Sequence, residues 1–262
     1  FLSAIVFCNS FVSFTFASFA SSFLIAFCID LNDSSASNLV ILYLSHNFAN
    51  VMTLLNVQQI YALVDINHCN GVCSYSCSKI TLFFCQKYES SITYWISEPD
   101  RGQSHAIKKG LKKCTGEIFN WLNSDDWYTP GALFEVANAF INNSSAQFVS
   151  GYENHVELSG NVNVHNGTFL KPSIEETIEF CEVTQPSTFF KLDAIRKVHG
   201  VSEDLHYIFD GEMWVKLLLQ YGQSHFVKIK TVLVNFRLHS DSKTVSNNLV
   251  NNFLFERSSI IA

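Results

Sequence analysis

The sequence is poor in charged residues and has no excess of basic ones. Its 262 residues include 17 Lys and Arg against 23 Asp and Glu, which gives a net charge of −6. Charged residues make up 15% of the chain and hydrophobic residues 48%. A nucleic-acid-binding domain needs a basic face, so we expect no nucleic acid partner. Anionic ligands would have to bind at a local site rather than through a general positive field.

Several catalytic signatures are also missing. The chain has no P-loop, no GxGxxG run and no Ser-His-Asp pattern, so kinase, dehydrogenase and hydrolase functions gain no support. Its eight cysteines do not resemble the framework of a small disulfide-rich domain. "HCNGVCSYSC" (68–77) spaces its cysteines as C-x3-C-x3-C, whereas structural zinc sites favour C-x2-C pairs. We therefore interpret the cysteines as thiols in a reducing compartment.

Residues 1–29 lack charge altogether and contain eight of the 24 phenylalanines. Their length exceeds the roughly 20 residues that span a bilayer, which favours a membrane anchor, although no basic flank accompanies them. The first residue is Phe, so we interpret the sequence as a fragment. Residues 1–36 are expected to be a separate apolar segment, either a membrane segment or non-native sequence.

The second half shows regular alternation of strand and helix patterns. Strands are predicted at 91–97, 118–123 and 146–152, with helices at 104–114 and 129–143 between them. This order predicts a parallel, doubly wound α/β sheet. Strands are also expected at 37–45 and 59–65, helices at 173–182, 191–200 and 210–222, and one or two strands at 225–239. Residues 160–170 are expected to form a short hairpin or a loop.

Two adjacent carboxylates, Asp125 and Asp126, follow the predicted strand at 118–123 in "WLNSDDWYTP". Ligands of open parallel sheets bind at the carboxyl ends of the strands. Neighbouring carboxylates repel each other, and a divalent cation between them and a polyphosphate would offset that cost. Such oxygen ligands suit Mg²⁺ or Mn²⁺. The alternative is a solvated Asp-Asp turn that caps the following helix.

A longer stretch, "YWISEPDRGQSHAIKKGLKKCTGEIFNWLNSDDWYTPGAL", resembles the donor-binding half of family-two glycosyltransferases with the GT-A fold. Three later runs also resemble this family: "QPSTFFKLDAIRKVHG" (185–200), "FDGEMWVKLLLQYG" (209–222) and "FRLHSDSKT" (236–244). The resemblance implies an α/β fold of GT-A type, with a Rossmann-like, mostly parallel sheet flanked by helices. It implies a glycosyltransferase domain at 37–245, with a donor half at about 37–150, an acceptor half at about 151–245 and a C-terminal tail at 246–262.

The resemblance also implies roles for individual residues. Asp126 would bind a divalent cation (Mg²⁺ or Mn²⁺), and Asp210 would be the general base. His239 is either a further cation contact or an ordinary histidine at a strand end. Trp214 either stacks on a sugar or belongs to the core. The remaining implied residues bind the donor (Asp65, Asp100, Arg101 and Asp125) or lie on the acceptor side (Gln185, Glu212 and, in the first alternative, Trp214).

The function implied is sugar transfer, with inversion, from a nucleotide-sugar donor to a saccharide or lipid-linked acceptor. The expected setting is synthesis of cell-surface polysaccharide in the cytoplasm, with membrane association. Departures from the family pattern are His105 in place of Asp, Lys108 in place of Asn, and the first 80 residues, which lack the family's opening motifs. A shifted reading frame or degeneration would explain that region. Two alternatives therefore stay open: a degenerate, inactive relative, or a membrane-anchored domain that binds a nucleotide or saccharide.

Overall fold

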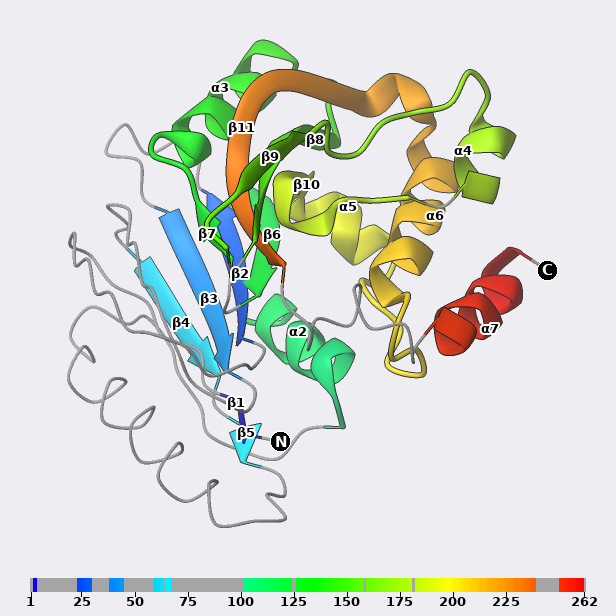
Figure 1. The fold of residues 1–262 in the computed structure, drawn as a ribbon, viewed down its shortest axis with the longest axis horizontal. Coiled ribbons are helices and arrows are strands. Elements are labelled where there is room, and N and C mark those ends of the chain that lie inside the picture. The colour runs from blue at the N-terminus through cyan, green and yellow to red at the C-terminus, as the bar shows by residue number, and fades with distance from the viewer. Residues whose placement is uncertain are drawn as a thin grey trace.

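A mixed β-sheet forms the centre of the computed structural model (Figure 1). The structure describes residues 101–123, 126–157, 159–180, 182–238 and 250–261, together with five strands nearer the N-terminus. These early strands are β1 (Leu2–Ser3), β2 (Phe23–Ile29), β3 (Asn38–Leu44), β4 (Gln59–Leu63) and β5 (Asp65–Ile66). The strand order in the main sheet is β4-β3-β2-β6-β10-β8-β11-β7, with β9 paired to β8.

From residue 101 onward, strands alternate with helices much as the sequence predicts. The strands are β6 (Ile118–Asn123), β7 (Trp127–Tyr128), β8 (Phe148–Glu157), β9 (Val162–His165), β10 (Thr188–Lys191) and β11 (Phe226–Leu238). The α-helices are α2 (Gln103–Leu111), α3 (Ala132–Asn142), α4 (Ile174–Phe180), α5 (Leu192–Lys197), α6 (Phe209–Tyr221) and α7 (Val250–Ile261). Two short 3-10 turns, η2 (Gln185–Ser187) and η3 (Gln223–His225), precede β10 and β11.

The α/β class is confirmed, but the expectation of a mostly parallel sheet is wrong among the described pairings. Among the described strands of the main sheet, only β3–β4 and β8–β11 pair in parallel. Strand β2 runs antiparallel to both β3 and β6, and β10 lies between β6 and β8 and runs antiparallel to both. A strand–helix–strand pattern places β6 and β8 in the same direction, but it does not show that a later strand will separate them.

The interior of the sheet is built from aromatic side chains. Trp214 of α6 is fully buried, with its ring centroid 5.3 Å from that of Phe148 and 5.9 Å from that of Phe226. Aromatic side chains bury more area than any other type, and edge-to-face contacts of this kind add stability. The helix therefore docks on the sheet through β8 and β11. The other fully buried large side chains are Trp121, Phe119, Phe140, Phe189 and Phe190.

The apolar N-terminal segment predicted at residues 1–36 falls largely outside the described residues. Its longest described part, Phe23–Ile29, is strand β2, which pairs antiparallel with β6. Within the described part of the chain, none of the helices combines the length and the hydropathy needed to cross a membrane. The cysteine run at 68–77 lies outside the described residues.

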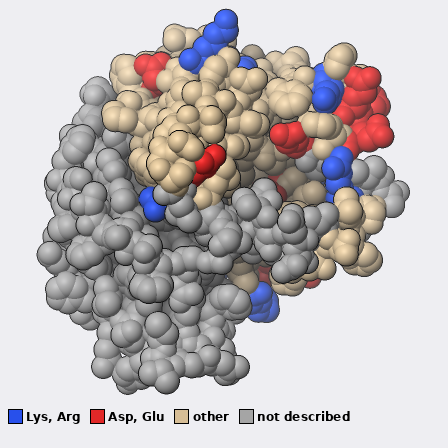
Figure 2. Space-filling view, viewed as in Figure 1, with Lys and Arg blue, Asp and Glu red and all other residues tan. Residues whose placement is uncertain are grey.

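Helix α7 holds two other helices in place through neighbouring side chains of opposite charge. The Glu256 carboxylate accepts hydrogen bonds from the backbone N–H groups of His206, Tyr207 and Ile208, at 2.8–3.0 Å, just before α6 begins. The Arg257 guanidinium donates to the carbonyls of Glu179 and Phe180 at the end of α4. Each charge suits the helix end that it contacts, because helix N-termini favour anions and C-termini favour cations. Figure 2 shows acidic side chains gathered over α4, which bears Glu175, Glu176 and Glu179.

We predict that Glu256→Ala lowers the free energy of unfolding by about 1–3 kcal/mol, because it removes a charged acceptor shared by three N–H groups. Chemical denaturation followed by circular dichroism would measure the change. Glu135→Ala, an exposed acid in the first turn of α3, is the matched control and should change stability by no more than about 0.5 kcal/mol. Equal effects of the two substitutions would contradict this role for Glu256.

Candidate functional site

Asp126 lies just beyond the end of β6 and is buried, with only 2% of its surface exposed. Its Oδ1 accepts the backbone N–H of Arg237 on β11 at 3.0 Å. The next residues, Trp127 and Tyr128, pair antiparallel with Asn235 and Val234. This pairing holds the turn after β6 against the far end of β11, so residues 111 positions apart in sequence come together.

Positive charge and an aromatic ring accompany this carboxylate. The guanidinium of Arg237 lies 5.2 Å from the ring centroid of Trp127. Its Nε is buried and has no hydrogen-bond partner among the described residues. Burial, followed by the charge of Asp126, raises the pKa of the Tyr128 hydroxyl well above its ordinary value. The site therefore combines a buried acid, a nearby arginine and a tyrosine that stays protonated at neutral pH.

Asp210 lies in the first turn of α6, and its Oδ1 accepts the N–H of Gly211 at 2.8 Å. The neighbouring Phe209 packs on Trp121 of β6, with ring centroids 6.4 Å apart. The N-terminus of α6 is therefore anchored to the strand that leads to Asp126. The dipole of the helix favours a carboxylate at this position.

Three further candidates on the acceptor side are partly or fully buried. Trp214 is completely buried in the core, which matches the core alternative for this residue. Glu212 forms an ion pair with Lys216 one turn later. Gln185 is 5% exposed, and its amide donates to Asn120 Oδ1 at 3.2 Å and to the carbonyl of Trp121 at 2.5 Å. The Gln185 side chain therefore holds η2 against β6.

Arg101 belongs to a cluster of positive side chains around Glu203. It forms an ion pair with Glu203, and Lys108 Nζ lies 3.7 Å from the same carboxylate. Partial burial alone would raise the pKa of Glu203. The hydrogen bond from Arg101 and the charges of His105, Arg101 and Lys108 outweigh the effect of burial, so the pKa of Glu203 is lowered. The ion pairs thus join the start of the described segment at 101–108 to Glu203, about 95 residues later in the chain.

The remaining candidates lie outside what the structure describes. These are Asp100, Asp125, His239 and the side chain of Asp65, whose backbone begins β5. Their assignment stays a prediction.

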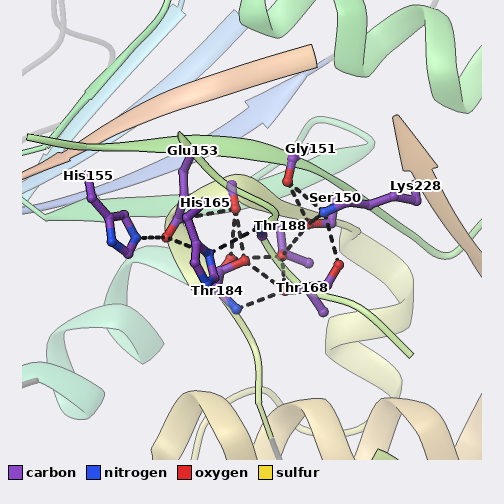
Figure 3. Close-up of polar contacts among 11 residues, drawn as sticks. Ser150, Gly151, Glu153, His155, His165, Thr168, Thr184, Thr188 and Lys228 are labelled. Carbon is purple, nitrogen blue, oxygen red and sulfur yellow. Dashed lines mark hydrogen bonds and ion pairs between the residues drawn. The ribbon is translucent and has the colours of Figure 1, made fainter. Parts of the chain in front are cut away.

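Sequence reasoning missed a second buried carboxylate with two histidines beside it (Figure 3). Glu153 of β8 is 3% exposed, and its Oε1 lies 2.8 Å from His155 Nε2 and 3.7 Å from His165 Nδ1. Its Oε2 accepts a hydrogen bond from Ser187 Oγ at 3.0 Å. The two imidazole rings stack, with centroids 4.7 Å apart and an angle of 13° between the planes.

The hairpin between β8 and β9 brings His165 to this place. β9 pairs antiparallel with β8, with His165 opposite Glu153 and Asn163 opposite His155. After β9 the chain turns at Gly167, where φ is 69° and an added Cβ would lie 2.0 Å from the carbonyl oxygen of Gly151. Only glycine permits so close an approach together with a positive φ.

A network of hydroxyl groups and one lysine lies beside Glu153, on the side away from His155 (Figure 3). Lys228 Nζ donates to the carbonyls of Gly151 at 2.8 Å and Thr168 at 3.0 Å. Burial lowers the pKa of Lys228 to about 8, although the charge of Glu153 acts in the opposite direction. The hydroxyls that complete the network belong to Ser150, Thr168, Thr184 and Thr188.

Three neighbouring strands connect the two acidic centres. Tyr128, Val234 and Glu153 lie opposite one another on β7, β11 and β8. Directly opposite residues project to the same face, and each strand step is roughly 4.8 Å. Glu153 is therefore about 10 Å from Tyr128, which follows Asp126 by two residues.

Comparison with known proteins supports the resemblance. Residues 74–193 match the family model described as "Glycosyl transferase family 2". This part of the chain is therefore similar to family 2 glycosyltransferases. The expected resemblance is thus confirmed, and the matched region includes Asp126 and the Glu153 cluster.

Several Rickettsia proteins with similar sequences are named as glycosyltransferases. The chain is 27% identical over 179 residues to an uncharacterized glycosyltransferase of Rickettsia typhi. It is 27% identical over 177 residues to another from Rickettsia conorii. These alignments cover 62% and 61% of this chain but 52% and 27% of the two relatives. The chain thus spans about half the length of the first relative and less of the second.

The fold resembles that of a solved Staphylococcus aureus protein. This protein is TarS, solved as residues 1–349 in complex with UDP-GlcNAc, and its fold matches that of this chain with a TM-score of 0.54 at 14% sequence identity. The match covers 69% of this chain and 52% of the TarS chain. The complex of the same TarS region with UDP gives a TM-score of 0.50. The predicted GT-A type of α/β fold is therefore confirmed.

One signal in the sequence could have revealed the missed cluster. Glu153 and His155 are two residues apart, so in a strand they project to the same face. The sequence "NVNVHNG" at 161–167 alternates and ends in an Asn-Gly turn signal. The hairpin register was needed to place His165 beside them.

We predict that the pH dependence of stability reports on Lys228. Its folded-state pKa of about 8 lies below the ordinary value of 10.5, so between these values the unfolded chain binds the extra proton. The free energy of unfolding should therefore rise as the pH increases from about 8 towards 10.5, and Lys228→Met should lose this rise. Lys230→Met, an exposed lysine on the same strand, should keep it. Parallel profiles for wild type and Lys228→Met in urea unfolding would contradict the assignment.

Proposed function

We propose that this domain transfers a sugar from a nucleotide-diphosphate sugar to an acceptor hydroxyl, with inversion at the anomeric carbon. The observation that supports the proposal most is the buried Asp126 carboxylate at the end of β6, which is held by the Arg237 N–H and lies within the region similar to family 2 glycosyltransferases. A buried carboxylate is costly unless it is compensated. A cation–diphosphate pair would provide that compensation.

The residues at this end of the sheet suit a cation and a diphosphate. Asp126 Oδ1 accepts the Arg237 N–H, which fixes the carboxylate at the end of β6, where it would be an oxygen ligand for the ion. Carboxylate oxygens suit Mg²⁺ or Mn²⁺, and when bound the ion would stabilise negative charge on the departing diphosphate. The buried Nε–H of Arg237 has no partner among the described residues, and a diphosphate oxygen would satisfy it. Asp125 and His239 would complete the ligand set.

Asp210 is proposed as the general base. It would accept the proton of the acceptor hydroxyl while the hydroxyl oxygen attacks the anomeric carbon from the side opposite the diphosphate. Its first-turn position and its hydrogen bond from the Gly211 N–H keep the carboxylate oriented. Arg101, Asp65 and Asp100 would bind the nucleotide, and Glu212 would lie on the acceptor side. The acceptor is proposed to be a saccharide or a lipid-linked saccharide at the membrane surface, within cell-surface polysaccharide synthesis.

We predict that one nucleotide stabilises the chain against thermal unfolding only in the presence of a divalent cation. UDP, GDP and dTDP would each be tested with and without Mn²⁺; UDP is included because TarS was solved with it. Asp126→Ala should abolish the increase in melting temperature, since binding to the native state alone produces it. If no nucleotide stabilises the chain, the donor site is not assembled, and the degenerate-relative alternative would hold.

We predict that Asp210→Asn reduces kcat by about 10²–10⁴-fold while the nucleotide-induced rise in melting temperature stays. Asn keeps the size of Asp but cannot accept the proton. The matched control is Asp193→Asn, which changes an exposed aspartate in the first turn of α5. Sugar transfer from the donor whose nucleotide stabilises the chain provides the rate. A loss shared equally by both variants, or no loss in Asp210→Asn, would remove Asp210 as the base.

A further inference from the structure

The geometry points to a second metal site at Glu153, His155 and His165, which takes a divalent transition metal such as Zn²⁺. One ligand atom from each residue lies within 4.8 Å of the others. This site differs from the proposed donor-cation site, which has Asp126 as its central ligand. It uses imidazole nitrogens as well as a carboxylate oxygen.

The charge on Glu153 is the first argument. The carboxylate is 3% exposed, and among the described residues no Lys or Arg forms an ion pair with it. Lys228 directs its ammonium group to the carbonyls of Gly151 and Thr168 instead (Figure 3). A buried carboxylate needs a positive partner close by. The charge of Lys228 acts on Glu153 without an ion pair between the two groups, and a cation bound at the cluster would be the closer partner.

The stacked histidines favour the cation. Their ring centroids are 4.7 Å apart with an angle of 13° between the planes, so the two rings bring one ligand nitrogen each to the same carboxylate. A divalent ion would supply positive charge between the rings and the carboxylate, and it would bind neutral imidazoles. Two histidines and one carboxylate form a common ligand set for zinc and other first-row transition metals.

The distances suit such an ion. Glu153 Oε1 lies 2.8 Å from His155 Nε2 and 3.7 Å from His165 Nδ1. These values bracket the roughly 3.4 Å that separates neighbouring ligand atoms in a tetrahedral zinc site. Coordination by His165 Nδ1 would replace the hydrogen bond that it accepts from the Gly167 N–H at 3.2 Å. The His165 ring would turn about its Cβ–Cγ bond, and its side chain is 37% exposed, which leaves room to do so.

A supporting hydrogen bond is already present. Ser187 Oγ donates to the other carboxylate oxygen, Oε2, at 3.0 Å and thereby orients the carboxylate. Partners of this kind position metal ligands and raise metal affinity. The bound ion would tie β9 to β8 and leave a coordination position for water or for an oxygen of a ligand.

The test is metal binding by the full chain without nucleotide, measured by equilibrium dialysis against Zn²⁺ and elemental analysis. Wild type should bind one Zn²⁺ per chain more than His165→Ala or Glu153→Gln. His225→Ala, a histidine away from the cluster, should bind as much as wild type. Asp126→Ala should also keep this ion, so a defect of the donor site leaves the result unchanged.

Cobalt spectra separate this site from the cysteines. Co²⁺ bound at the cluster should show ligand-field absorption without thiolate charge transfer, and His165→Ala should lose it. Glu153→Gln guards against misfolding, because Gln keeps the shape of the side chain and removes the buried charge. This variant should be at least as stable as metal-free wild type, yet its melting temperature should not rise with Zn²⁺. Equal metal content in wild type, His165→Ala and Glu153→Gln would overturn the proposal, and so would cobalt spectra from thiolates alone.

Discussion

The burial of negative charge is the constraint on which the candidate sites depend. Asp126 and Glu153 are 2% and 3% exposed. Water cannot solvate such carboxylates, so the surrounding chain must supply hydrogen bonds and positive charge. Asp126 has the Arg237 N–H and a nearby guanidinium, whereas Glu153 has two imidazoles and the Ser187 hydroxyl. Both arrangements need β11 or β9 to pair in the observed register, and this links the chemistry of the sites to the topology of the sheet.

The inserted strand β10 explains how the two halves of the domain fit together. The Asn120 amide of β6 donates to the carbonyls of Gln185, Pro186 and Thr188, while its Oδ1 accepts from Gln185. A buried amide satisfied in this way fixes η2 and the start of β10 against β6. The same turn contains Ser187, which contacts Glu153. One short segment thus connects the strand that leads to Asp126 with the strand that bears the histidine cluster.

Local pattern in the sequence predicted the elements well, because each depends mainly on its own residues. The helical spacing of residues 210–222, closed by Gly222, corresponds to α6, and "IFNWLN" corresponds to β6. Neighbour relations in the sheet were harder, since antiparallel insertion of β10 depends on contacts between distant residues such as Asn120 and Gln185. The position of Asp126 followed from its place after a strand. The Glu153 cluster did not, because it required the register of a hairpin and the close approach at Gly167.

Two departures from the family pattern, His105 and Lys108, act on the same acid, Glu203. His105 and Lys108 replace an acid and an amide, which taken alone suggests surplus positive charge near the donor. In the folded chain both influence Glu203, which also pairs with Arg101. The added charge is therefore balanced by an acid about 95 residues later, on the loop between α5 and α6. That loop ends at the N–H groups bound by Glu256, directly before Asp210. Residues 101–108 thus contact, through Glu203, the loop that leads to the proposed base.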